Sequence, residues 1–178
     1  MTACFRIWRL AIAFSVLVVM PLRAETSSHG TPAIAQTIAS VPSGALAIGN
    51  DPALVVTAEK LAALPRRTVS TKQTGKDGER TNTWAGPLLW DVLVTAAAVD
   101  PAKHGDHSHL VLYATGRDGY VATVALAELF FDFENKSVIV ADRMNDAPLP
   151  DHALRLIVPE DRRAGRSVRD LVRVVVGR

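Results

Sequence analysis

The stretch from Arg143 to Pro159, RMNDAPLPDHALRLIVP, decides the fold that the sequence indicates. Its Asn-Asp pair is followed by Pro148 and Pro150, and such clusters of turn-forming residues interrupt helices and strands. The apolar run LRLIVP comes directly afterwards and has the composition of a buried strand. The stretch therefore predicts a sharp turn that enters the core, either as a plain loop or as the rim of a binding site.

The chain before this stretch alternates strand and helix patterns. ALAIG, from residue 45, predicts a strand, and TAEKLAALP predicts a short helix that is capped by Thr57 and ends before Pro65. RTVSTKQTGKDGERTNTW predicts a hairpin that turns between Gly75 and Gly78. The apolar spacing in GPLLWDVLVTAAAVD predicts a helix that starts at Pro87 and ends near Asp100.

The second half of the chain is richer in strands. HLVLYATG and GYVATVAL predict two strands joined by a turn at Gly119, and AELFF predicts a short helix with Glu128 near its start. SVIVA, LRLIVP and VRDLVRVVV predict three further strands. Because helices and strands are interleaved without a regular period, the pattern favours an α+β fold with mixed or antiparallel sheets and a few short helices.

Three segments together resemble the sulfite-oxidase-type molybdopterin-binding domain. They are TWAGPLLWDVLVTAA, GRDGYVATVALAE and SVIVADRMNDAPLPDHALRLIVP, in the order in which the family carries similar segments. The last is the most specific, since family members have a Met-Asn-Gly-x-Pro-Leu-Pro turn before a strand that carries an arginine and ends in Val-Pro. The resemblance implies the sulfite-oxidase-type molybdopterin-binding fold, with the turn of the stretch from Arg143 to Pro159 at the border of the cofactor pocket.

The same resemblance implies three cofactor-binding residues. In the family, a histidine and an arginine around the proline turn hold the pterin and its phosphate, and the matching residues are His152 and Arg155, with Tyr120 near the same cleft. A guanidinium pairs with phosphate through two hydrogen bonds, and an imidazole can donate another. This chain departs from the family in two places. Its DHALR segment is two residues shorter, and Asp146 replaces the turn glycine.

A cysteine is missing where the resemblance implies a metal ligand. Catalytic members of the family hold molybdenum through a cysteine thiolate, a soft ligand suited to this metal. The corresponding segment, RRTVSTKQTG, offers Ser70, Thr71 and Lys72 but no cysteine, and the one cysteine of the chain is Cys4. We therefore expect no catalytic residue and no bound molybdenum.

The motif HGDHSH, residues 104–109, is the other candidate for chemistry. His104, Asp106, His107 and His109 are side chains that can bind zinc or copper. No predicted helix or strand fixes their directions, so we favour a polar, solvated loop and expect no metal site there.

The N-terminal residues predict export. Arg6 and Arg9 precede a short apolar run that ends near a small residue, Ala24, which is typical of a signal peptide over residues 1–24. Residues 25–43 then predict a flexible segment, and residues 44–178 the molybdopterin-binding-like domain. We expect no membrane span once the signal is removed, and a periplasmic or secreted location.

Charge and composition exclude other classes of function. The first 24 residues carry three arginines and no acid, so their removal takes the formal net charge from +2 to −1. Without a positive field or a run of basic residues, we expect no nucleic-acid binding.

Together these observations predict an exported, non-catalytic module that binds a small anionic ligand or a periplasmic protein partner. We expect no cofactor. Molybdopterin remains the alternative, for a molybdopterin-dependent oxidoreductase or a subunit of one. A second alternative is a periplasmic metal-binding protein that uses residues 104–109.

Overall fold

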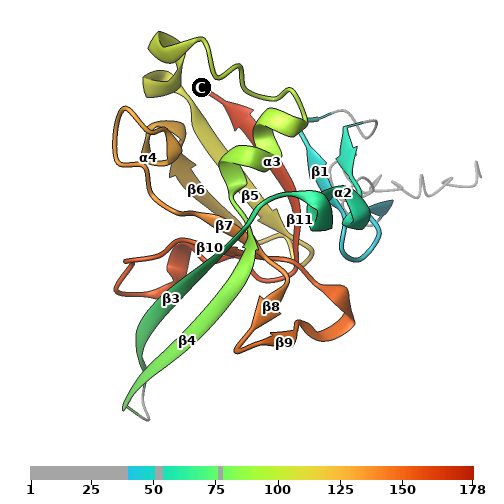
Figure 1. Ribbon diagram of the computed structural model, residues 1–178, viewed down its shortest axis with the longest axis vertical. Helices are drawn as coiled ribbons and strands as arrows, with labels where there is room; N and C mark the ends of the chain where they lie inside the picture. The colour runs from blue at the N-terminus through green and yellow to red at the C-terminus, as the bar shows by residue number, and fades with distance from the viewer. Residues whose placement is uncertain (1–39, 51–53, 76–77) are drawn as a thin grey trace, which may run out of the picture. The chain divides into compact units, whose positions relative to one another are not determined.

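The computed structural model describes residues 40–50, 54–75 and 78–178 (Figure 1). The predicted signal peptide and most of the predicted flexible segment lie outside these residues. Within the described part of that segment, Val41 is buried against Ala45, Ala47 and Val172. Among the described residues, none of the helices has the length and apolar character that a membrane span requires.

The largest sheet has five strands in the order β2-β1-β11-β5-β6. They are β1 (Leu46–Ile48), β2 (Val55–Val56), β5 (Val111–Gly116), β6 (Val121–Ala125) and β11 (Leu171–Gly177). β1 and β11 are parallel, and the other neighbours are antiparallel. The mixed sheet predicted from the sequence is therefore confirmed.

The three short α-helices of the described residues are α2 (Ala58–Ala63), α3 (Leu89–Thr95) and α4 (Leu126–Leu129). Leu89, Val92 and Leu93 of α3 are fully buried, and they belong to the same apolar cluster as β1, β5, β6 and β11. Burial of this cluster supplies the main stabilisation of the five-stranded sheet.

Two smaller sheets complete the fold. β7 (Ile139–Ala141) pairs with β10 (Arg155–Ile157), and the other sheet has the order β3-β4-β8-β9. Its strands are β3 (Arg66–Gly75), β4 (Gly78–Pro87), β8 (Arg143–Met144) and β9 (Ala147–Pro148). Trp84 of β4 packs against Ile139, Ala141 and Ile157, which joins the two sheets. β4 and β7 approach so closely that only a glycine fits at position 86.

The predicted helix at Pro87 is placed wrongly at both ends. Pro87 is the last residue of β4 and pairs with Arg66, so the helix begins only at Leu89. It ends at Thr95 because Ala97 adopts a positive φ of 53°, and the Ala98 N–H donates to the carbonyl of Leu93. This helix ending usually has glycine at the position that Ala97 occupies, so no residue at this position indicated it.

Several other elements agree with the sequence-based predictions. Thr57 caps α2 by accepting a hydrogen bond from the N–H of Lys60, and Gly119 has a φ of 84° in the turn between β5 and β6. β3 and β4 form the predicted hairpin, with Gly75 opposite Gly78. The stretch from Arg143 to Pro159 forms β8, β9, a 3-10 turn η2 (Pro150–His152) and β10.

The turn between β8 and β9 is strained at Asp146. Asn145 and Asp146 both have positive φ, 47° and 65°, the conformation of a two-residue hairpin turn that favours Asn followed by Gly. Asn145 also ties this turn to β4, because its side chain accepts a hydrogen bond from the N–H of Thr83 and donates one to Asn82.

We expect Asp146→Gly to raise the free energy of unfolding by about 0.5–1 kcal/mol, because glycine adopts this conformation without the steric cost of a Cβ atom. Urea unfolding measures the change. Asn145→Gly is the matched control, and it should not stabilise the protein because it loses the bonds to Thr83 and Asn82. An Asp146→Gly protein no more stable than wild type would contradict the account.

Candidate functional site

Arg155 is the first residue of β10, and its side chain covers the ring of Trp84. The guanidinium carbon lies 4.7 Å from the ring centroid, a cation-π distance. Trp84 is itself buried, and its indole Nε1 donates a hydrogen bond of 2.9 Å to the hydroxyl of Thr71. The hydrogen bond to Thr71 of β3 therefore fixes the orientation of the indole, and the indole in turn positions the side chain of Arg155.

The guanidinium of Arg155 has no acidic partner among the described residues. Its Nε is buried and makes no hydrogen bond to that part of the chain. Burial, and to a smaller extent the charge of Arg169, lower the pKa of Arg155. An arginine nevertheless stays protonated in proteins, so the site holds a partly buried cation to which the described part of the chain supplies no counter-ion. Such a group gains free energy from any anion that reaches it.

An open pocket of about 290 Å³ lies beside this guanidinium. Its walls come from residues 149–155, from the two residues before β11 and from one residue before β1. They consist of Ser43, Leu149, Pro150, Asp151, Ala153, Leu154, Arg155, Arg169 and Asp170. Asp170 is held by Arg117 at 3.1 Å, so its charge is already balanced. Two arginines and one remaining carboxylate, that of Asp151, make the pocket positive on balance.

Of the three residues that the resemblance implied, the structure places only Arg155 in the wall of this pocket. His152 is exposed at the end of η2, between the wall residues Asp151 and Ala153. Tyr120 is 49% exposed, and its hydroxyl donates to the carbonyl of Gly165, which is not a wall residue. His152 is therefore a neighbour of Arg155 in the sequence, but neither His152 nor Tyr120 is a wall residue of this pocket.

Arg169 is the residue that the sequence analysis missed. It lies two residues before β11 and ten residues after Pro159. It reaches the pocket because the N–H of Leu156 donates to the carbonyl of Val168 and the N–H of Leu171 donates to the carbonyl of Leu154, which places residues 168–171 beside β10. The one available signal was a second arginine near the start of a predicted strand, in VRDLVRVVV.

The segment that replaces the metal-binding part of the family contains no soft ligand. Thr71 is buried and its hydroxyl accepts the bond from Trp84, whereas Ser70 and Lys72 are exposed. Over the described residues, no group of three or more His, Cys, Asp or Glu side chains is placed to hold a metal ion. The residues present therefore fit the phosphate of a pterin at Arg155, but they do not fit the metal that a pterin carries.

The histidine motif forms a 3-10 helix, η1 (His104–His109), and not the solvated loop that we predicted. His107 is 1% exposed, its Nε2 lies 3.0 Å from the carbonyl of Asp100, and its ring packs edge-on against Trp90 and Phe130. His104 contacts Asp132 at 2.8 Å. The loop interpretation is wrong for His107 because the aromatic side chains of α3 and the α4 region cover it.

The family model of the oxidoreductase molybdopterin binding domain matches residues 54–178, more than half of the chain. The match includes β3, β4, Trp84, Arg155 and Arg169. A search of curated proteins finds no match.

Proposed function

We propose that this chain, which belongs to the oxidoreductase molybdopterin-binding domain family, is an exported non-catalytic module that holds a small anion or a phosphate-bearing ligand at Arg155. The domain is of the sulfite-oxidase type, and its family binds molybdopterin. The basic N-terminal residues and the short apolar run after them support export to the periplasm or the medium.

The observation that carries the proposal is the guanidinium of Arg155, which is partly buried and has no ion-pair partner among residues 40–50, 54–75 and 78–178. Burying a charge without a partner costs free energy, so a fold keeps such a group where a ligand completes it or where function requires it. Trp84 lies against the guanidinium at 4.7 Å and restrains it, and a guanidinium can make a two-point contact with a phosphate or carboxylate. Arg169 adds a second positive charge.

The non-catalytic part of the proposal rests on the residues of β3. A thiolate is the ligand that molybdenum needs from this segment, and Thr71 instead uses its hydroxyl to hold Trp84. When bound, the cofactor would supply redox chemistry at its metal, while Arg155 and Arg169 would hold its phosphate. Family membership favours the alternative, a molybdopterin-dependent oxidoreductase or a subunit of one. Molybdenum and pterin analysis of protein from its native host separates the two.

We expect inorganic phosphate to raise the melting temperature of the wild-type protein by a few degrees. A ligand that binds only the folded state at ten times its dissociation constant stabilises it by about 1.4 kcal/mol. Arg155→Ala should remove the shift, and Arg155→Lys should keep part of it, because lysine retains the charge but not the two-point contact. Thermal unfolding in phosphate measures this against sodium chloride of the same ionic strength.

The matched control is Arg162→Ala, an exposed arginine that is not part of the pocket wall. It should leave the shift unchanged. The proposal fails if sodium chloride produces the same shift as phosphate, or if the shift survives in Arg155→Ala.

A further inference from the structure

The outer edge of β3 pairs with no other strand in the part of the chain that the structure describes. β3 is the terminal strand in the order β3-β4-β8-β9, and within the described residues β4 is its one strand neighbour. In Figure 1, β3 and β4 form a ribbon that extends away from the five-stranded sheet, with β8 and β9 on the β4 side only. A long open edge is a template for another extended chain.

The backbone groups of Thr68 and Ser70 face this open edge. The carbonyl of Thr83 accepts a hydrogen bond from the N–H of Asn145, and the carbonyl of Ala85 accepts one from the N–H of Asp142, so Thr83 and Ala85 direct their backbone groups away from β3. Their partners on β3 are Ser70 and Thr68.

Hydrogen-bonded and non-hydrogen-bonded pairs alternate in an antiparallel ladder. Thr68, Ser70 and Lys72 therefore present their N–H and C=O groups outward. Pro87, which has no N–H, fits the same alternation opposite Arg66.

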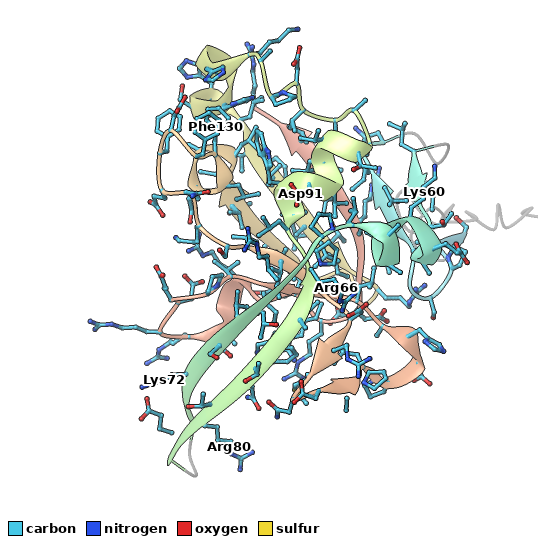
Figure 2. All side chains as sticks on the ribbon, viewed as in Figure 1. Lys60, Arg66, Lys72, Arg80, Asp91 and Phe130 are labelled. Atoms are coloured by element: carbon cyan, nitrogen blue, oxygen red, sulfur yellow. The ribbon has the colours of Figure 1, made fainter. Side chains whose placement is uncertain are left out.

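Three pockets follow the same edge and share walls. A pocket of about 510 Å³ lies between Ser70 and residues 134–137. It shares Asn135, Lys136 and Ser137 with a pocket of about 220 Å³, and it shares Ser70 and Glu160 with a pocket of about 440 Å³ that also includes Lys72. We call this continuous depression the β3 groove. Figure 2 shows Lys72 on the side of the ribbon that borders it.

The end of the β3 groove nearest the start of β3 combines apolar walls with a cation. The 220 Å³ pocket there contains Trp90, Leu129 and Phe131, and Phe131 is 62% exposed. Arg67 and Lys136 also line it. Lys136 is neutralised by Glu128 at 2.7 Å and by Glu134 at 2.9 Å, so Arg67 supplies the available positive charge.

We propose that the β3 groove binds the extended C-terminal tail of a partner protein. The tail pairs antiparallel with β3 through Thr68, Ser70 and Lys72, a known mode of peptide recognition. A chain in this direction ends at the start of β3, where its last, apolar side chain enters the pocket beside Trp90 and Phe131, and its terminal carboxylate meets Arg67. A second copy of β3 fits poorly, because two-fold pairing would bring the cations of both strands together.

The first experiment compares the full chain with two variants, using a phage library of random seven-residue peptides with free C-termini. Ser70→Pro removes the outward N–H and obstructs the edge without breaking a bond to β4, whereas Ser70→Ala keeps the backbone intact. We expect the wild type and Ser70→Ala to enrich peptides with alternating β-formers and an apolar last residue, and Ser70→Pro to enrich none. Circular dichroism and cooperative melting confirm that each variant folds.

The second experiment uses the most enriched peptide in synthetic form. We expect Arg67→Ala, or amidation of the peptide C-terminus, to weaken binding about twofold to fivefold, the range for an exposed charge pair, and the two changes together to weaken it no further. Amide exchange should slow at Thr68, Ser70 and Lys72 on binding, and not at Val69 and Thr71, whose N–H groups already bond to β4.

The proposal is overturned if the wild type enriches no peptide that Ser70→Pro fails to enrich, or if amidation of the peptide has no effect on binding. It is overturned as well if binding slows amide exchange at Val69 and Thr71 and not at Thr68, Ser70 and Lys72. It is also overturned if the peptide competes with self-association of the protein, because a second copy would then be the occupant. None of these readouts depends on phosphate binding at Arg155.

Discussion

Replacing Gly86 with alanine is expected to lower the free energy of unfolding by about 3 kcal/mol or more, or to prevent folding altogether. A Cβ atom at this position would lie 2.0 Å from the carbonyl oxygen of Val140 and 2.8 Å from the Cα of Ala141. Both obstacles are backbone atoms of β7, which cannot move aside as a side chain can. The variant must therefore separate β4 from β7, and this exposes the packing of Trp84 against Ile139 and Ala141.

Urea unfolding of Gly86→Ala measures this effect, and Gly165→Ala is the matched control. A Cβ at Gly165 meets no atom within 4 Å, and Gly165 does not adopt a positive φ. The control should change stability by less than about 0.5 kcal/mol. If Gly86→Ala were as stable as wild type, β4 and β7 would not approach as closely as described.

Glu128 is expected to contribute about 1–2 kcal/mol to stability at neutral pH through charged hydrogen bonds. Its carboxylate is 16% exposed and accepts bonds from Lys136 at 2.7 Å and from Arg166 at 2.9 and 3.1 Å. Arg166 also binds Asp161 at 2.6 Å, so Glu128 joins α4 to the segment around η3 (Ala164–Arg166). Glu128→Gln keeps the shape of the side chain but loses the charge.

The contribution of Glu128 should depend on pH in one direction. Burial alone would raise the pKa of Glu128, but the bonds from Lys136 and Arg166 outweigh it and lower the pKa below the usual 4.5. A carboxylate with a lowered pKa stabilises the fold fully above its unfolded pKa, and this stabilisation is lost as pH falls through the folded value. The stability gap between wild type and Glu128→Gln should therefore be constant near pH 7 and close below about pH 4.5.

Glu134→Gln is the control for this series. Glu134 also contacts Lys136 but is 59% exposed, so its charge should contribute much less. Denaturant unfolding between pH 3 and pH 8 gives both curves. A gap that stays constant over the whole range would show that Glu128 acts through its shape and not through its charge.

The sequence predicted those parts of the fold that depend on local patterns. The hairpin of β3 and β4, the cap at Thr57 and the turn at Gly119 follow from residues within a few positions of one another. The parallel pairing of β1 with β11 joins Ala47 to Arg173, and no local signal marks it. The predicted helix start at Pro87 is wrong for the same reason. The strand β4 continues through Pro87 because the next residue, Leu88, forms a β-bridge with Ile139 of β7, which lies far away in the sequence.

The candidate site shows the same division. The turn before β10 and the arginine that follows it were visible in RMNDAPLPDHALRLIVP, and Arg155 indeed lines a pocket. The sequence did not reveal that the guanidinium of Arg155 would pack on the ring of Trp84, about seventy positions earlier, or that Arg169 would lie near it. It also did not reveal that His107 would be buried, because the aromatic residues that cover it lie in α3 and after α4.

The position of β11 has a consequence for how the protein is made. β11 comes after every other element along the chain, yet it lies between β1 and β5. While the ribosome is still translating residues 171–177, the nascent chain can form local hairpins, but β1 has no partner through which to join β5. The central sheet therefore cannot close before β11 has been synthesised, and the apolar residues of β1 and β5 stay available to chaperones until then.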